Sequence, residues 1–239
     1  MRANSPLDTF AMPTPNPPTA DMKSALYAQI ARVGLALGSA GRLQILEYVA
    51  QGERSVDVLA GMTGLSVANT SKHLQALRQA GLVVARKDGL RVYYGLAGDD
   101  VVTLISALRA VAEERVAEVG KIVRLWLGNR DAMEAVPAKE LLARAKQGLV
   151  TVLDVRPPEE FAVGHVPGAI NVPLDKLESY LSRLPRKKEV VAYCRGPYCL
   201  MSFEAVEKLR ARGWRARRLE NGLPEWRAAG LPVAQDKPA

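Results

Sequence analysis

Residues 65–96 read LSVANTSKHLQALRQAGLVVARKDGLRVYYGL, and the fold of the N-terminal half follows from this segment. Ser66 can cap a helix that runs to about Gln79, because a serine side chain accepts backbone N–H groups of the first turn, and Gly81 can close that helix. Two alternating apolar runs come next, joined by KDG at 87–89, where Asp-Gly is a strong hairpin signal. The segment therefore predicts a capped helix followed by a two-stranded β-hairpin.

Helices are predicted on both sides of this segment. Residues 22–37 and 40–50 read as helices, and Ser55 can cap a short helix at 56–62. After the hairpin, apolar residues recur at three- and four-residue steps through 101–126, which predicts one long helix. A short helix, a turn, a capped helix and a hairpin follow one another in the order of a winged helix-turn-helix, a mainly α fold with a β-hairpin wing.

Such a fold places its second helix in the major groove of DNA and its wing against adjacent phosphates. Small polar side chains let the helix backbone approach DNA, Asn69 can pair with an adenine edge, and Val67 can face inward. Five basic residues between 66 and 95 are balanced by one acid, Asp88. A solvated helix face beside a core histidine is the alternative, and the basic hairpin favours DNA. The candidate DNA-binding residues are Ser66, Asn69, Thr70, Ser71, Lys72, His73, Gln75, Arg86, Lys87 and Arg91.

The same segment resembles the recognition helix and wing of the ArsR/SmtB family of bacterial repressors, and the resemblance covers roughly residues 23–126. It implies a homodimer built on the terminal helices, here the apolar helix at 101–126, and a palindromic double-stranded DNA operator. Many members hold a metal through a Cys-x-Cys pair, but this sequence has Ser55 and Asp57 in that region. Other members use histidine on the last helix, and 99–127 contains none. Soft metals prefer thiolate or imidazole, so we expect no metal site here and an input signal from elsewhere.

The second half has a different pattern. After a linker at 128–137, the segments TVLDV (151–155) and VVAY (190–193) read as buried parallel strands. Alternation of strands and helices predicts an α/β domain with a parallel sheet over 138–239. The helices are expected at 138–146, 175–184 and 200–212.

Both cysteines of the chain lie in CRGPYC, 194–199. Cys194 follows a predicted strand at the carboxyl edge of the sheet, where ligands bind in such folds. Amides of the loop and of the next helix favour a thiolate there, so we expect Arg195 and the backbone amides of Gly196 and Tyr198 to stabilise an anion. Buried inert cysteines are the alternative for either residue taken alone.

This half resembles the rhodanese (sulfurtransferase) domain over about 138–232. The resemblance is carried by LDVRPPEEFAVGHVPGAINVP at 153–173, by ENGLPEW at 220–226 and by Cys194 at the position of the nucleophile. It implies that three residues of the first segment support the fold more than the reaction: Asp154, Arg156 and His165.

The loop departs from the rhodanese pattern Cys-x-x-Gly-x-Arg, because Cys199 stands where the arginine is expected. This change argues against efficient turnover with thiosulfate, and Leu200 argues against the longer arginine-closed loop of phosphatase-like relatives. A second thiol suggests a different reaction. Cys194 can accept a sulfane sulfur as nucleophile, and Cys199 can act as the resolving thiol.

Composition limits the remaining choices. A net charge of +8 and a pI near 9.6 permit a polyanionic partner. The proline-rich residues 1–20 read as a disordered tail without a secretory h-region, and no apolar run is long enough to span a membrane. Two cysteines without a signal sequence predict a cytoplasmic protein. We expect neither a cofactor nor a metal.

The leading hypothesis is a homodimeric repressor, with a DNA-binding domain at 21–127, that senses a sulfane sulfur donor such as polysulfide, persulfide or thiosulfate through Cys194 and Cys199. The alternative is an active sulfurtransferase that forms a Cys194 persulfide and carries an attached DNA-binding domain. A sensor of arsenite or another thiophilic ion is less favoured, because two thiols per chain are too few for trigonal As(III).

Overall fold

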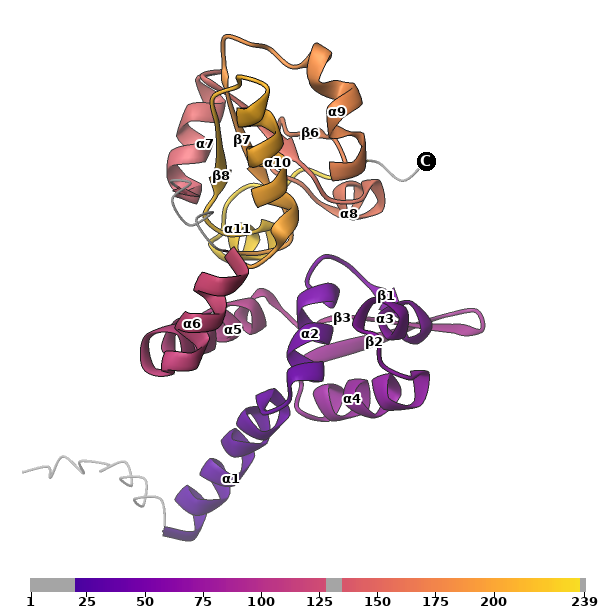
Figure 1. The fold of residues 1–239 in the computed structure, drawn as a ribbon. Coiled ribbons are helices and arrows are strands. Elements are labelled where there is room, and N and C mark those ends of the chain that lie inside the picture. The colour runs from indigo at the N-terminus through magenta and orange to yellow at the C-terminus, as the bar shows by residue number, and fades with distance from the viewer. Residues whose placement is uncertain (1–19, 128–134, 237–239) are drawn as a thin grey trace, which may run out of the picture.

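The computed structural model describes residues 20–127 and 135–236, which form two domains (Figure 1). The N-terminal domain is helical with a three-stranded antiparallel sheet, and the C-terminal domain is a parallel sheet flanked by helices. The predicted fold class, a winged helix-turn-helix followed by an α/β domain, is confirmed. None of the described helices is long and apolar enough to cross a membrane.

The N-terminal domain is a winged helix-turn-helix whose sheet has the strand order β1-β3-β2. Its elements are α1 (Ala20–Leu37), α2 (Ala40–Val49), β1 (Arg54–Ser55), α3 (Val56–Thr63), α4 (Val67–Gln79), β2 (Val83–Asp88), β3 (Arg91–Leu96), α5 (Asp99–Arg115) and α6 (Ala117–Leu127).

Local signals fix the ends of the helix-turn-helix. Gly64 ends α3 in the left-handed region at φ 70°, which a glycine adopts without a Cβ clash. The Ser66 hydroxyl then accepts the Asn69 N–H at 3.3 Å and caps α4. The expected cap at Ser55 is wrong: its backbone starts α3 in an extended conformation, but its side chain makes no capping hydrogen bond.

The core of this domain lies between α2, α3 and α4. Ile45, Leu46, Leu59, Leu74 and Leu77 are completely buried. Full burial of such a side chain is worth about 1.5–3 kcal/mol, so α4 is held by its leucines while its opposite face stays free. The expectation that Val67 faces inward is wrong, because its side chain is 51% exposed. Val67 lies in the first turn of α4, ahead of the buried residues of this helix.

The long helix expected at 101–126 is two helices. Val116 has an extended backbone (φ −107°, ψ 100°) that ends α5, and α6 starts at the next residue. Figure 1 shows α6 folding back beside α5 and leading toward the C-terminal domain. The apolar periodicity is the same on both sides of the break, so the sequence pattern predicted a continuous helix.

The C-terminal domain has a parallel five-stranded sheet with the order β4-β8-β7-β5-β6. Its elements are β4 (Ala135–Val136), α7 (Ala138–Lys146), β5 (Val150–Asp154), α8 (Pro158–Val163), β6 (Ile170–Asn171), α9 (Leu177–Tyr180), β7 (Glu189–Tyr193), α10 (Leu200–Ala211), β8 (Ala216–Leu219) and α11 (Leu223–Ala228). Short 3₁₀ turns at Leu174–Lys176 and Leu181–Arg183 flank α9.

The two central strands, β5 and β7, are buried on both faces, as expected for a parallel sheet covered by helices. Val190 and Ala192 face one apolar cluster, and Val191 and Tyr193 face the other. Strands β4, β6 and β8 were not predicted. The end of the expected linker at 128–137 therefore belongs to the sheet as β4; its residues 128–134, and residues 1–19 of the expected tail, lie outside the described residues.

Candidate functional site

The thiol loop, residues 194–199, joins β7 to α10 at the carboxyl edge of the sheet. Cys194 follows the last residue of β7, and Cys199 occupies the N-cap position of α10, a helix of 12 residues. The Cys199 side chain makes no capping hydrogen bond, but it lies beside the N-terminus of the helix, where the unpaired N–H groups of the first turn favour a negative charge. The sheet and the helix thus place the two sulfur atoms in different electrostatic surroundings.

Cys194 is a buried thiol. It is 1% exposed, and its Sγ lies 3.4 Å from both the Cys199 carbonyl oxygen and Ser202 Oγ. Burial raises the pKa of the Cys194 thiol well above its ordinary value, and the adjacent Cys199 adds to the rise. Cys194 therefore keeps its proton at neutral pH in this arrangement.

Cys199 is the better candidate for the thiolate. Hydrogen bonding from the Cys194 thiol, helped by the backbone N–H groups of Arg195 and Met201 and the Arg195 charge, lowers the pKa of Cys199 to about 7 against the effect of burial. The sequence placed the amide-stabilised thiolate on Cys194. The surroundings favour it on Cys199, because the N–H groups of Arg195 and Met201 act there, whereas at Cys194 the effect of burial outweighs the Gly196 N–H.

Arg195 is engaged by a buried carboxylate. Its Nε lies 3.0 Å from both carboxylate oxygens of Glu160, and its Nη2 lies 2.7 Å from Oε1. Glu160 is 1% exposed and is shared with Arg54 of the N-terminal domain at 3.6 Å. Arg195 also lies over the Tyr48 ring, 5.6 Å from its centroid. The predicted anion-stabilising charge is therefore shared between Glu160 and the Cys199 sulfur.

The middle of the thiol loop faces the N-terminal domain. The Gly196 carbonyl accepts the Cys199 N–H at 3.2 Å, which closes the loop as a turn. The Tyr198 hydroxyl hydrogen-bonds to Glu113 of α5, and the Arg109 guanidinium lies 5.2 Å from the centre of the Tyr198 ring.

Gly222 of the C-terminal motif packs directly on the thiol loop. The Leu223 N–H donates to the Cys194 carbonyl at 3.4 Å, and a Cβ on Gly222 would overlap the Arg195 carbonyl group. Glu225 extends this contact, since its Oε2 accepts the Gly222 N–H at 3.1 Å and its Oε1 lies 3.2 Å from Arg109 Nη1. The motif thus supports the loop and joins it to α5.

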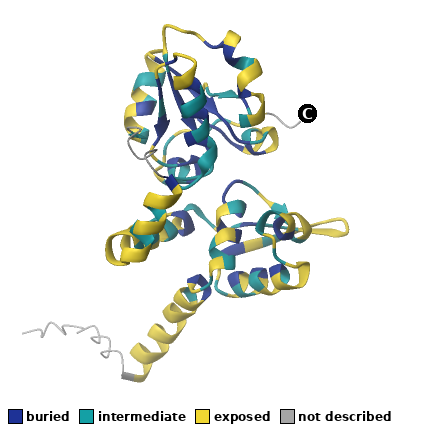
Figure 2. Ribbon diagram, in the orientation of Figure 1, coloured by how far each residue is buried: buried dark blue, intermediate teal, exposed yellow. Residues whose placement is uncertain are grey.

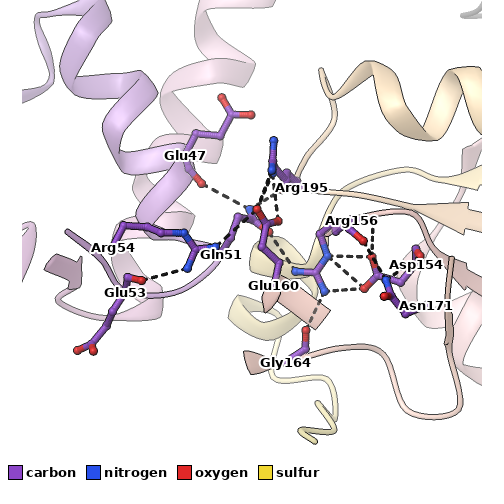
Figure 3. Close-up of polar contacts among 10 residues, drawn as sticks. All are labelled: Glu47, Gln51, Glu53, Arg54, Asp154, Arg156, Glu160, Gly164, Asn171 and Arg195. Atoms are coloured by element: carbon purple, nitrogen blue, oxygen red, sulfur yellow. Dashed lines mark hydrogen bonds and ion pairs between the residues drawn. The ribbon is translucent and has the colours of Figure 1, made fainter. Parts of the chain in front are cut away.

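The residues Asp154, Arg156 and His165 lie apart from the sulfur chemistry. Arg156 is completely buried and donates to both carboxylate oxygens of Asp154 and to the Gly164 carbonyl (Figure 3). The His165 ring stacks on Phe161 with centroids 3.7 Å apart, and its Nδ1 lies 3.0 Å from the Phe161 carbonyl. These contacts hold the loop after β5 in place.

One residue of the N-terminal domain reaches into this framework. Gln51, just after α2, is 2% exposed. Its Nε2 donates to the Arg195 carbonyl at 3.0 Å, and its Oε1 accepts from Arg156 Nη1 at 3.2 Å (Figure 3). Nearby, a cavity of about 290 Å³ lies between the domains, lined by α2, α5 and the thiol loop.

The candidate DNA-binding residues lie on α4 and the wing, which projects from the domain and is exposed in Figure 2. Thr70 is the exception: it is completely buried and its hydroxyl donates to the Ser66 carbonyl at 3.0 Å, so its expected DNA contact is wrong. His73 and Ser71 are half-buried. The exposed members of the set are Ser66, Asn69, Lys72, Gln75, Arg86, Lys87 and Arg91.

Arg86 carries its charge differently from the other basic residues of the wing. Its Nε lies 2.8 Å from Glu53 and its Nη1 lies 3.2 Å from Asp88. It also lies over the Tyr93 ring. Arg86 therefore stabilises the wing through its ion pairs with Glu53 and Asp88. It can bind a phosphate group only if these ion pairs break.

A relative that covers almost the whole chain decides the family. HTH-type transcriptional regulator Rv0324 of Mycobacterium tuberculosis is 46% identical over 218 residues, which is 91% of this chain and 96% of that protein. The family model described as "Bacterial regulatory protein, arsR family" matches residues 39–84. The chain belongs to the ArsR family. A second model, the rhodanese-like domain, matches residues 137–229.

Two further similarities each cover one domain of this ArsR-family chain. A sulfurtransferase of Allochromatium vinosum is 33% identical over 85 residues, 35% of this chain and 78% of that protein. The solution structure of the homodimeric winged helix-turn-helix DNA-binding domain of Mb0332 from Mycobacterium bovis is 46% identical and covers 43% of this chain and 95% of that chain, with a TM-score of 0.40.

The sequence of this ArsR-family chain did not single out Gln51 and Glu160, the two residues that contact Arg195 of the thiol loop. A glutamine after a helix and a glutamate in EEF are ordinary surface residues by pattern, and only their burial between the domains distinguishes them. Among the described residues, no three His, Cys, Asp or Glu side chains are grouped so that they could hold a metal ion.

Proposed function

We propose that this ArsR-family transcriptional regulator is a homodimeric repressor that senses reactive sulfur through Cys194 and Cys199. One observation carries the proposal. The loop that holds both thiols of the chain packs against the DNA-binding domain, through Gln51 on one side and Glu113 on the other. A chemical change at sulfur therefore acts on atoms in contact with the domain that would read DNA.

The proposed DNA contact uses the exposed face of α4 and the wing. Helix α4 is capped, rigid and free on the side away from its leucines, as the major groove requires. Asn69 lies in its first turns, where base edges are reached, and Lys72, Lys87 and Arg91 can neutralise phosphates.

The proposed homodimer uses apolar side chains that the single chain leaves exposed. Large exposed apolar patches on monomers mark interaction surfaces. Here they gather on α1, α5 and α6, which are largely exposed in Figure 2. Mb0332, similar to the N-terminal domain, is described as homodimeric. The exposed apolar residues of these helices are Met22, Leu26, Tyr27, Ile30, Leu35, Leu104, Leu108, Val111, Ile122, Leu125 and Trp126.

The proposed chemistry has two steps. A thiolate attacks the outer sulfur of a persulfide donor R–S–SH, the S–S bond breaks, R–S⁻ leaves and takes up a proton, and the protein gains a persulfide. The second cysteine then attacks the protein sulfur of that persulfide, and the outer sulfur leaves with the proton of the second thiol as H₂S. Two protein thiols are oxidised to a disulfide, and one sulfane sulfur is reduced to sulfide.

The lowered pKa of Cys199 supports Cys199 as the first acceptor and the buried Cys194 as the resolving thiol. This order reverses the one suggested by the sequence, in which Cys194 accepts sulfur. Both orders give the same disulfide. They differ in which single-cysteine variant still accumulates a persulfide.

Fluorescence anisotropy tests the function with the full chain and DNA from upstream of its own gene. Reduced protein should bind, and polysulfide-treated protein should bind with an affinity changed by tenfold or more, as for a coupling of about 1.4 kcal/mol. Dithiothreitol should restore the original affinity. Equal binding of reduced and treated protein, with modification verified by mass, contradicts the proposal.

The similarity to a sulfurtransferase favours a second candidate, an enzyme that passes the Cys194 or Cys199 persulfide to an acceptor. Sustained transfer of sulfur from thiosulfate to cyanide would support it. The absence of an arginine at the sixth position of CRGPYC argues against it, because that position would hold the anionic donor.

A further inference from the structure

Gln51 connects the two domains through both ends of its side-chain amide. Its Nε2 donates to the Arg195 carbonyl at 3.0 Å and its Oε1 accepts from Arg156 Nη1 at 3.2 Å (Figure 3). Arg156 is itself fixed by Asp154 and the Gly164 carbonyl, so it is a rigid anchor. Gln51 therefore ties a residue of the thiol loop to a fully buried ion pair of the C-terminal domain.

Arg195, the loop residue that Gln51 holds, also influences the ionisation of Cys199. The Arg195 N–H helps to lower the pKa of Cys199, and the Arg195 carbonyl accepts the hydrogen bond from Gln51 Nε2. The Arg195 side chain is held by Glu160, which Arg54 of β1 also contacts. The backbone and the side chain of Arg195 are thus both held, directly or through Glu160, by residues of the DNA-binding domain.

We propose that Gln51 is a positioning residue of the thiol site. Gln51 fixes the Arg195 backbone, and the DNA-binding domain thereby completes the amide environment of Cys199. The hydrogen bond from Gln51 to the Arg195 carbonyl also carries the state of the thiols to the DNA-binding elements. The first part concerns the thiol site alone. The second part rests on the proposed function.

The path from Gln51 into the DNA-binding domain is short. Gln51 lies between α2 and β1 in the chain. Ile45 and Leu46 of α2 share one core with Leu74 and Leu77 of α4. Strand β1 pairs with β3 of the wing. A displacement of Gln51 is therefore passed to α4 through the core of α2 and to the wing through β1.

Few charged or titratable groups set the ionisation of Cys199. The Cys194 thiol and the Arg195 guanidinium act on it directly. Glu160, Tyr48 and Glu47 act on Arg195. Gln51 is uncharged, so an effect of its substitution on Cys199 reports position and not a lost charge.

The first experiment measures the alkylation rate of each thiol against pH in the full chain. Trypsin cuts after Arg195, so Cys194 and Cys199 fall on separate peptides, 189–195 and 196–208, and mass spectrometry reads them independently. Gln51→Met keeps the length of the side chain and removes both hydrogen bonds. Arg227→Ala is the matched control, since it removes a different interdomain contact, Arg227 Nε to Asp99 at 2.7 Å, on α11 away from Gln51.

The wild type should show a Cys199 midpoint near pH 7. Gln51→Met should slow Cys199 alkylation at pH 7 by roughly two- to fivefold, the result of a midpoint raised by about half to one unit. Arg227→Ala should keep the wild-type profile. A wild-type profile for Gln51→Met would overturn the positioning role. If that variant lacks a cooperative melting transition, Gln51→Ala replaces it, because water can then reach Arg156.

The second experiment measures the change in operator affinity on polysulfide treatment. Transmission of the thiol state through Gln51 is supported if treatment changes the operator affinity of the wild type and of Arg227→Ala, but not that of Gln51→Met, although the thiols of Gln51→Met are modified. An equal response in Gln51→Met overturns transmission and leaves the proposed function standing. If the wild type does not respond, the proposed function and its transmission fail together, and the alkylation profile still decides the positioning role.

Discussion

Glu160 forms an ion pair with Arg195, with Nη2 and Oε1 2.7 Å apart, although its carboxylate is only 1% exposed. Buried ion pairs are costly to break, because removing one partner leaves the other without compensation. Glu160 thus restrains the Arg195 guanidinium, whose charge helps to lower the pKa of Cys199.

Glu160→Gln should increase the reactivity of Cys199. The released Arg195 charge stabilises the thiolate, so the pKa of Cys199 should fall below its value of about 7. Alkylation at pH 6 should accelerate about threefold, corresponding to a shift of about half a unit. Glu159→Gln, on the exposed side of the same helix, is the control. A slower or unchanged Cys199 in Glu160→Gln would show that Arg195 does not act on the sulfur.

The two thiols should differ in their pH dependence. A thiol reacts as its thiolate, so a lowered pKa moves the rise in rate to lower pH and a raised pKa moves it to higher pH. Cys199 should be half-maximally reactive near pH 7, and Cys194 should stay nearly unlabelled there. Tryptic peptides separate the two sites. Preferential labelling of Cys194 at neutral pH would contradict the arrangement of the loop.

Gly222→Ala should destabilise the C-terminal domain by about 1–3 kcal/mol, as overpacking does, because the new Cβ meets the Arg195 carbonyl. Urea denaturation measures the change. Gly196→Ala is the matched control in the same loop, since its Cβ would meet only Glu225 Oε1 at 3.9 Å. Equal stability of Gly222→Ala and the wild type would mean that the loop can move away from α11 at no cost.

Lys72→Ala should weaken binding to all DNA sequences alike. The slope of log K against log salt concentration should become smaller by about 1, the effect of one lost phosphate contact. Lys72 is exposed on α4, where phosphates flank the major groove. Lys139→Ala, an exposed lysine on α7 of the other domain, removes the same charge away from the proposed contact. A matching loss of affinity in both variants would point to net charge instead of a local contact.

Most elements could be predicted because their signals are local. The Ser66 cap, the Gly64 and Gly81 turns and the Asp88-Gly89 hairpin each depend on a few neighbouring residues. The break at Val116 and the two-residue strands β4 and β6 could not be predicted, because they depend on packing between distant segments and carry no periodicity of their own.

The position of the thiol loop could be predicted, and its ionisation could not. Strand-cysteine-helix order places both sulfur atoms at the edge of the sheet. The pKa of Cys194 and Cys199 depends on burial and on which sulfur receives the helix amides, and these follow from the folded loop. Gln51 joins the site only when the two domains meet, across 144 residues of sequence.

The central claim is that the state of the thiol loop sets the affinity for DNA. A polysulfide titration of one sample should record two quantities at each step, the fraction of Cys194 and Cys199 modified and the fraction of DNA bound. The two curves should coincide, dithiothreitol should reverse both, and Cys199→Ser should flatten the DNA curve. Complete modification of both thiols with unchanged DNA binding would contradict it.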